Sequence, residues 1–153
     1  MHPADREVQA FLACSMVARL ATLSARGRPH LTPLSFVCEG GRIYMTTAAK
    51  TLAPRNIATH PSVVALFDAE RAARPDRVLR IRGHARLRTD RDAQRIILRR
   101  GARKYYLCAS GLLSVLQHLY KLPVWLSAFF AGVDTVVVEV VPETAEFTPR
   151  MWE

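Results

Sequence analysis

Cysteine is scarce in this chain, and so are lysine and the acidic residues. The three cysteines among its 153 residues, Cys14, Cys38 and Cys108, lie far apart and in no Cys-x-x-Cys or Cys/His spacing. This pattern excludes a disulfide framework and a zinc site, so we expect reduced, mostly buried thiols and no metal. Because half of the residues are hydrophobic, a disordered chain is also excluded, and one domain over residues 1–153 can bury a core without cross-links.

Long apolar runs are missing as well. Residues 1–9 mix charged side chains with no apolar stretch, so we expect no secretory signal and a cytoplasmic location. The longest charge-free piece, Tyr105–Tyr120, has 16 residues, whereas a span of the bilayer needs roughly 20. Lys121 and Pro123 interrupt the apolar sequence directly after it. We therefore expect no membrane span, and Tyr105–Val133 to be a buried helix pair or a dimer-facing hydrophobic insertion.

Positive charge exceeds negative charge. The chain has 22 Lys and Arg against 13 Asp and Glu, a formal net charge of +9, and only three of the 22 are lysine. Arginine suits the planar, bidentate capture of phosphate and carboxylate, which favours an anionic partner. The codon usage of a GC-rich genome explains the preference for arginine equally well.

Turn residues recur about every ten residues in the first half of the chain, which predicts a meander of short strands. The expected strands are Val17–Ser24, His30–Cys38, Arg42–Thr47 and Ser62–Asp68, with turns at Gly27 and at Glu39-Gly40-Gly41. Helices are expected at Glu7–Ser15 and at Ala48–His60, the latter closed by Pro61. Glu70–Arg77, with its proline and arginines, is expected to be a loop.

The second half begins with a strict period of two. In Val78–Arg88, apolar residues and Gly83 alternate with a basic set, which predicts a strand with one apolar and one basic face. The basic set is Arg80, Arg82, His84, Arg86 and Arg88. Thr89 and Asp92 form a predicted capping box for a helix at Arg91–Gly101. The β-branched run Thr135–Val141 predicts a last strand buried on both faces.

Five strands, then helices, then a sixth strand define the expected order of elements. Antiparallel turns with little alternation of strand and helix favour a small closed or split barrel over a doubly wound sheet.

Short motifs along residues 16–89 add a family resemblance. They are Ala18-Arg19-Leu20-Ala21-Thr22-Leu23, Gly27-Arg28-Pro29-His30, Pro33-Leu34-Ser35-Phe36, Ile43-Tyr44-Met45-Thr46-Thr47, Arg55-Asn56-Ile57 with His60-Pro61, and Arg80-Ile81-Arg82-Gly83-His84-Ala85. In this order the chain resembles the FMN-binding split-barrel superfamily, which includes pyridoxamine 5'-phosphate oxidase-like and flavin- or deazaflavin-dependent oxidoreductases. The resemblance implies a mainly β protein, a six-stranded antiparallel split β-barrel with a helical insertion before the last strand. It also implies a homodimer with FMN, or the deazaflavin F420, in a groove between the subunits.

Cofactor-binding residues are implied by the resemblance position by position. In the family, the second strand lines the isoalloxazine, and a threonine and a basic residue after the third strand hold the phosphate. The family's phosphate-binding lysine is replaced by Ala53, so Lys50 or Arg55 would have to substitute for it. The start of a helix at this point also offers free N–H groups to an anion. The implied cofactor-binding set is His30, Leu31, Thr32, Pro33, Ser35, Thr46, Thr47, Lys50, Thr51, Arg55, Arg82 and Trp152.

Departures from the family limit the expected activity. Vitamin B6 oxidases of the family keep an Arg and a His two residues apart near the C-terminus, and no histidine follows Arg150. We therefore do not expect a true pyridoxamine 5'-phosphate oxidase, and no general acid or base is apparent. A single histidine on a strand, such as His30, is more typical of a structural hydrogen-bonding residue than of a proton donor or an anion contact. His118 lies among leucines and is expected to pack; it could serve as a haem ligand, as in some relatives, but no paired axial histidine can be assigned.

The expected function is that of an FMN-dependent oxidoreductase that moves a hydride to or from a small apolar or conjugated substrate. The alternatives are an F420-dependent oxidoreductase, a flavin- or haem-binding protein without catalysis, and a barrel that has lost its cofactor and serves as an interaction module. Nucleic acid is not an expected partner, because the basic strand contains no exposed aromatic residues.

Overall fold

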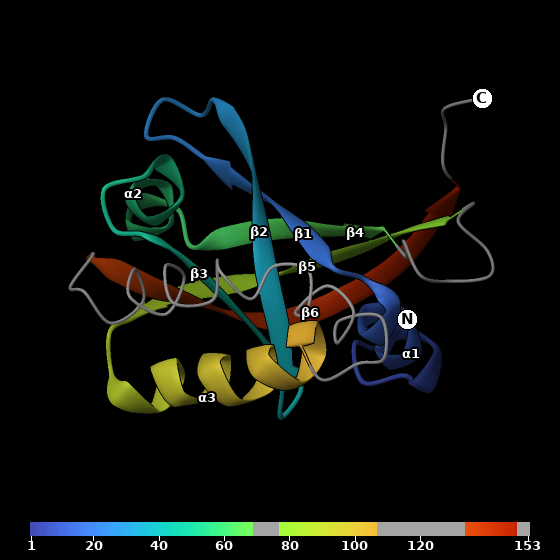
Figure 1. Cartoon of the computed structure of the whole chain (residues 1–153). Coiled ribbons are helices and arrows are strands. Elements are labelled where there is room, and N and C mark those ends of the chain that lie inside the picture. Colours follow the sequence, from blue (N-terminus) through green and yellow to red (C-terminus); the bar gives the residue numbers. More distant parts are fainter. Residues whose placement is uncertain (69–76, 107–133, 150–153) are drawn as a thin grey trace.

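The computed structural model of the chain describes residues 1–68, 77–106 and 134–149 (Figure 1). Six antiparallel strands close into a barrel in the order β1-β2-β3-β6-β5-β4, which confirms the predicted fold. The elements are α1 (Arg6–Cys14), β1 (Val17–Leu23), β2 (Pro29–Glu39), β3 (Arg42–Ala48), α2 (Leu52–Thr59), β4 (Ser62–Asp68), β5 (Arg77–Arg88), α3 (Arg91–Gly101), the π-helical turn η1 (Ala102–Tyr106) and β6 (Thr135–Pro149). Most of the predicted loop and of the predicted insertion lie outside the described residues, as do Cys108, His118 and Trp152. The predicted end of the loop at Arg77 is wrong, because Arg77 already pairs with Pro149 as the first residue of β5.

Two tight hairpins connect the first three strands, as predicted. Gly27 has a φ of 73°, and Gly40 and Gly41 have φ values of 56° and 74°. L-residues with a Cβ rarely adopt these angles, so glycine is required at both turns.

The barrel interior is filled by alternate residues of every strand. Phe36 and Phe67 meet edge to face at its centre, with ring centroids 4.8 Å apart. On β5 the period of two is confirmed from Leu79 to Ala85, but Leu87 is 38% exposed, because the apolar face there has passed the end of the barrel core. Cys14 and Cys38 are half-buried, less buried than predicted.

The last two strands form the longest ladder of the barrel. Because β5 pairs with β6 from Arg77↔Pro149 to Arg88↔Val137, β6 continues eight residues past the predicted end at Val141. A register shift between Arg82 and Gly83 absorbs one extra residue of β6. Gly83 permits this bulge, since a Cβ on it would lie 2.2 Å from the carbonyl oxygen of Val141.

Two helix starts differ from the prediction. The helix at Arg91–Gly101 is confirmed, but its N-cap is Asp90, whose carboxylate accepts from the Ala93 N–H at 3.2 Å, and the Thr89 capping box is wrong. A carboxylate one residue nearer the helix reaches the N3 amide first. α2 begins at Leu52, later than the predicted Ala48, because β3 stays paired with β6 as far as Ala48↔Thr135.

The helices cover different sides of the barrel (Figure 1). α3 packs against β2 and β3, and α2 packs against β1 and β5. A second apolar cluster joins α3 to the barrel through Val37, Tyr44, Ala93, Ile97 and Val137. Among the described residues, no helix has the length and apolar character needed to cross a bilayer.

The bulge provides a stability test. Gly83→Ala would drive a methyl group into the β6 backbone, so we expect a loss of about 2 kcal/mol of unfolding free energy in urea titrations. Arg86→Ala is the control, because Arg86 is exposed on the same strand and should change stability little. Equal stability of the two variants would contradict the assigned bulge.

Candidate functional site

β2 changes its partner halfway along its length. Pro29–Ser35 pairs with β1, whereas Phe36–Glu39 pairs with β3. Thr46, Thr47 and Ala48 at the end of β3 pair only with β6 among the described residues. The described chain therefore leaves an open seam between Pro29–Ser35 and Thr46–Ala48, where each strand has one edge without a neighbouring strand.

The prolines of β2 show which backbone groups face this seam. The Ser24 N–H donates to the Arg28 carbonyl at 2.9 Å, so even-numbered residues of β2 are the ones that bond to β1. Pro29 and Pro33 fall on the odd-numbered positions, where a missing N–H costs no bond within the ladder. Consequently the N–H groups of Leu31 and Ser35 point toward the seam and are available to a ligand.

The predicted lining residues of β2 do not share one face. Leu31, Pro33 and Ser35 are exposed on the outer face, while His30 and Thr32 are half-buried on the inner face. An ordinary strand separates neighbouring side chains in this way. Only Leu31, Pro33 and Ser35 can present their side chains to a ligand that lies over the outside of the seam.

Ser35 and Thr46, which come from the two sides of the seam, line one cavity of about 200 Å³. Its other walls are mainly apolar and aromatic and come from β2, β3 and the end of α3. They are Phe36, Val37, Tyr44, Ile97, Gly101 and Tyr105. The structure thus brings together two of the predicted residues that are more than ten positions apart in the chain.

Tyr105 closes the cavity at the point where β2 changes its partner. Its hydroxyl accepts from the Phe36 N–H at 3.0 Å and lies 2.8 Å from the Met16 carbonyl and 2.9 Å from the Phe36 carbonyl. The hydroxyl therefore takes the place of the next rung of the β1–β2 ladder. Sequence patterns gave no sign of this role, because it depends on a contact between residues 69 positions apart.

The predicted phosphate-binding residues gather around the start of α2. The Thr47 and Thr51 hydroxyls lie 3.0 Å apart, and the Thr51 hydroxyl donates to the Ala48 carbonyl at 2.8 Å. Lys50 and Arg55 are exposed beside them. Ala53, which replaces the family's lysine, is only 1% exposed, so this position of the helix faces the barrel.

Arg82 borders a separate cavity of about 480 Å³ on the outer face of β1, β4 and β5. Its floor includes Ala21 and Val64. Arg80 also lines it and bonds Glu146 through one terminal nitrogen at 2.5 Å, while its Nε is buried and has no hydrogen-bond partner. The unpaired buried Nε is unfavourable for the fold, and the lining of the cavity also includes the carboxylate of Glu143.

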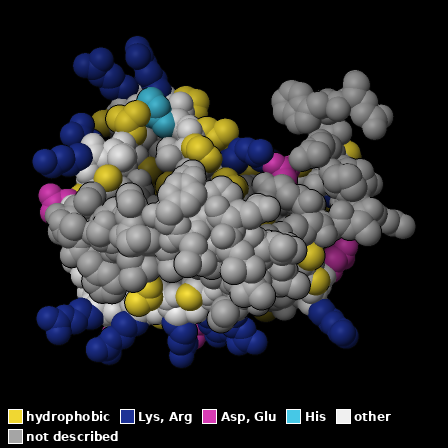
Figure 2. Space-filling model, in the orientation of Figure 1, with side chains coloured by type: hydrophobic (Ala, Val, Ile, Leu, Met, Phe, Trp, Pro, Cys, Tyr) yellow, Lys and Arg dark blue, Asp and Glu magenta, His cyan; other side chains and the backbone are white. Residues whose placement is uncertain are grey.

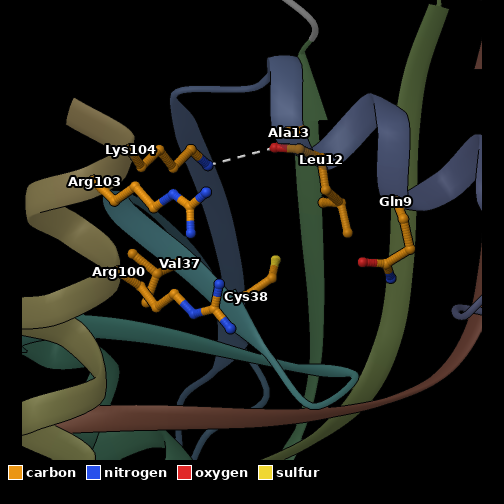
Figure 3. Close-up of a pocket in the computed structure, with 8 residues that line it drawn as sticks. All are labelled: Gln9, Leu12, Ala13, Val37, Cys38, Arg100, Arg103 and Lys104. Atoms are coloured by element: carbon orange, nitrogen blue, oxygen red, sulfur yellow. Dashed lines mark hydrogen bonds between the residues drawn. The ribbon is translucent and has the colours of Figure 1, made fainter. Parts of the chain in front are cut away.

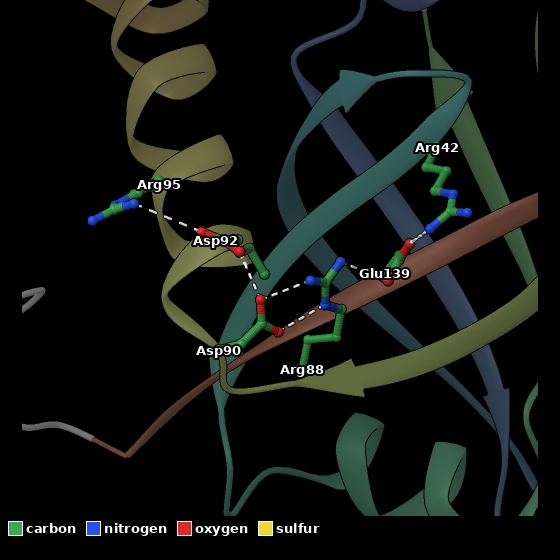
Figure 4. A network of polar contacts seen from close by, with 7 residues as sticks. Arg42, Arg88, Asp90, Asp92, Arg95 and Glu139 are labelled. Carbon is green, nitrogen blue, oxygen red and sulfur yellow. Dashed lines mark hydrogen bonds and ion pairs between the residues drawn. The ribbon is translucent and has the colours of Figure 1, made fainter.

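Two further members of the predicted basic face on β5, His84 and Arg88, contact carboxylates. His84 pairs with Glu143 at 2.6 Å, and Arg88 bonds both Asp90 and Glu139 (Figure 4). Glu139 was hidden in the sequence within an apolar run, and its side chain is only 3% exposed. It also pairs with Arg42, so two guanidiniums compensate this buried carboxylate and tie β3, β5 and β6 together.

Charge pairing in this network lowers the pKa of the acid Asp90 and raises the pKa values of Arg88 and Arg42. The hydrogen bonds from Arg88 lower the pKa of Asp90 from 3.8 to about 2, although partial desolvation opposes the shift. The same contacts raise the pKa of Arg88, and the Glu139 carboxylate raises the pKa of Arg42. All three groups stay charged at neutral pH, so the network is structural and offers no proton for chemistry.

Comparison with known proteins identifies the family. A family model described as pyridoxamine 5'-phosphate oxidase matches residues 4–124, and the chain therefore belongs to this family. No curated protein matches the sequence at a significant level.

Solved structures with the same fold share less than a quarter of their residues with this chain. The conserved hypothetical protein Rv2991 from Mycobacterium tuberculosis is 19% identical with a TM-score of 0.72, over 95% of this chain and 84% of that one. An F420 reductase is 20% identical with a TM-score of 0.57, over 90% and 94%. HutZ, the haem storage protein from Vibrio cholerae, is 18% identical with a TM-score of 0.64, over 97% and 95%. At these identities the likeness establishes the fold.

Removal of the buried charge tests the Glu139 network. Glu139→Gln weakens two charge-assisted hydrogen bonds, and we expect a loss of about 2 kcal/mol of unfolding free energy. Asp92→Asn is the matched control, since Asp92 is 80% exposed and lies 3.7 Å from Arg95. If urea denaturation finds the two variants equally stable, Glu139 does not hold the strands together.

The lowered pKa of Asp90 predicts a pH dependence of stability. Because the folded pKa lies below the unfolded value of 3.8, ionised Asp90 stabilises the fold above pH 3.8, and this contribution is lost as the pH falls toward 2. Asp90→Asn keeps a capping oxygen without the charge. The stability difference between wild type and this variant should therefore shrink from pH 4 to pH 2, as monitored by circular dichroism during urea unfolding, and a constant difference would contradict the assignment.

Proposed function

We propose that this protein is a homodimeric, cytoplasmic FMN-dependent oxidoreductase that transfers a hydride to or from a small apolar or conjugated substrate. The observation that carries the proposal is the open seam of the barrel. There, backbone donors of β2 stand beside a small cavity lined by Ser35 and Thr46.

The groups at the seam suit a flat heterocycle. The N–H groups of Leu31 and Ser35 can donate to ring carbonyl oxygens, and the hydroxyls of Ser35 and Thr46 can donate or accept. Pro33 adds a rigid apolar surface between them. His30 and Thr32, on the opposite face, would support the strand and not touch the ring.

The phosphate would lie at the start of α2. The N–H groups of Leu52 and Ala53 in the first turn have no partner within the helix, and the helix dipole favours an anion there. The paired hydroxyls of Thr47 and Thr51 lie at the same end. Lys50 and Arg55 supply the positive charge that the family's lysine provides in relatives.

A second copy of the chain would complete the groove. Large apolar side chains stand exposed on β1, β2 and α2: Leu23 is 43%, Leu31 56% and Leu52 52% exposed. Figure 2, in the orientation of Figure 1, shows hydrophobic side chains gathered near the upper edge of the molecule, with Lys and Arg side chains around them. Such a patch is typical of an interface between subunits. Trp152, outside the described residues, would reach the neighbouring subunit's cofactor.

FMN supplies the redox chemistry when it is bound, and the protein's part is to bind and orient the ring and the substrate. The apolar wall of the Ser35–Thr46 cavity, formed by Val37, Tyr44 and Ile97, favours an apolar substrate surface. None of the described residues in this cavity is a carboxylate or a histidine, which is consistent with a reaction that needs no protein acid or base.

F420 is the second candidate cofactor. The exposed guanidinium of Arg82 borders the larger cavity and could bond an acidic cofactor tail. Ala53 in place of lysine also weakens the preference for a simple phosphate.

The phosphate contribution can be measured with a matched ligand. Riboflavin has the ring of FMN without its phosphate, so we expect wild type to bind FMN about tenfold or more tightly than riboflavin in fluorescence titrations. The double variant Lys50→Ala/Arg55→Ala should lose this preference and keep its affinity for riboflavin. Arg95→Ala, an exposed arginine on α3, should keep the preference. A double variant that still prefers FMN would place the phosphate elsewhere.

The cofactor itself is identified by the absorbance spectrum of the purified protein, followed by titration with FMN, F420 and haem. Tight binding of FMN together with reoxidation of the reduced protein by oxygen or an added acceptor supports the oxidoreductase. Preference for F420 supports the second candidate. Binding of haem alone, or of none of the three, would contradict both.

A further inference from the structure

A third cavity lies between α1 and the end of α3 with the turn η1 that follows it. It has a volume of about 240 Å³ and is lined by Gln9, Leu12, Ala13, Val37, Cys38, Arg100, Arg103 and Lys104 (Figure 3). Three of these side chains are cationic and none is acidic. In Figure 3 the guanidiniums of Arg100 and Arg103 extend from the helix toward the space in front of α1.

The positive charges in this cavity are only partly compensated. Arg100 bonds Glu39, which also bonds Arg99 at 2.7 Å, and these bonds lower the pKa of Glu39. One carboxylate therefore serves two arginines. Arg103 forms no ion pair with any described residue, and it also borders the smaller cavity that Arg99 and Arg100 line.

Lys104 is held in place by the protein. Its Nζ lies 3.4 Å from the Leu12 carbonyl and 3.4 Å from the centroid of the Phe36 ring. Because these contacts hold the Lys104 ammonium group in position, an incoming anion would meet a preformed positive charge.

Cys38 reports the local environment. Burial raises the pKa of its thiol to about 11, although Lys104 and Arg100 act to lower it. The desolvation at the cavity floor outweighs the attraction of two nearby cations. The thiol is therefore desolvated, whereas Arg100 and Arg103 are in contact with solvent at the mouth of the cavity.

We propose that this cavity binds the phosphate group of a small phosphate ester or of free phosphate. The forked donors of Arg100 and Arg103 match phosphate oxygens in pairs, Lys104 adds a point charge, and Leu12, Ala13 and Val37 leave an apolar side for an organic substituent. The volume is below that of drug-sized pockets, which restricts the occupant to a small anion. This cavity contains none of the predicted cofactor-binding residues, and it shares only Val37 with the Ser35–Thr46 cavity.

The test is a calorimetric titration of the full-length protein, saturated with FMN, using inorganic phosphate and glycerol 3-phosphate at constant ionic strength. We expect Arg103→Gln to weaken binding of the anion about tenfold or more. Arg95→Gln, an exposed arginine on the same helix that does not line the cavity, should bind as wild type does. Because Arg103 pairs with no described residue, its replacement should leave the melting temperature without anion unchanged, and Arg103→Lys provides a second variant that retains the charge.

Five outcomes decide the proposal. Tighter binding of glycerol 3-phosphate than of phosphate supports an ester, and equal binding supports free phosphate. Protection of Cys38 from alkylation by the bound anion, measured on its own peptide by mass spectrometry, would support either result. Equal responses of Arg103→Gln and Arg95→Gln, or loss of binding in Lys50→Gln with Arg103 intact, would overturn the site.

Discussion

The change of partner along β2 is the constraint on which the site depends. A strand that paired with β1 and β3 along its whole length would leave no free donors, and its outer face would be an ordinary barrel wall. Because β2 pairs with β1 only as far as Ser35 and with β3 only from Phe36, the barrel is split. At the switch, the Tyr105 hydroxyl of η1 joins Phe36 to the Met16 carbonyl, so it continues the β1–β2 contact where the strand pairing ends.

The arginine excess serves at least two physical purposes. Arg42 and Arg88 neutralise the buried Glu139, and Arg99 and Arg100 share Glu39, so these four belong to the fold. Other guanidiniums, above all Arg82 and Arg103, border cavities and have no carboxylate partner among the described residues. A high arginine content therefore has no single explanation. Part of it compensates charge within the fold, and part is available to anions.

Sequence patterns predicted the secondary-structure elements correctly where neighbouring residues alone determine the conformation. The hairpin glycines, the alternation on β5 and the stop at His60-Pro61 depend on neighbouring residues only, and the structure confirms them. One prediction was wrong because a distant contact decides: β6 extended past Val141 because β5 gave it a partner. The Thr89 cap was wrong for a local reason, because Asp90 lies one residue nearer the helix and is held by Arg88, two positions before it.

The sequence by itself determined the class of fold, the order of six strands and the family resemblance, because turn residues and hydrophobic periodicity act over a few positions. It also located Ser35, Thr46 and the threonines beside α2 as candidates. Only the tertiary structure decided that Leu31, Pro33 and Ser35 face outward while His30 and Thr32 face inward, and that Arg103 stands unpaired at a cavity among the described residues. Strand register, helix docking and charge pairing join residues far apart in the chain, and no local pattern contains that information.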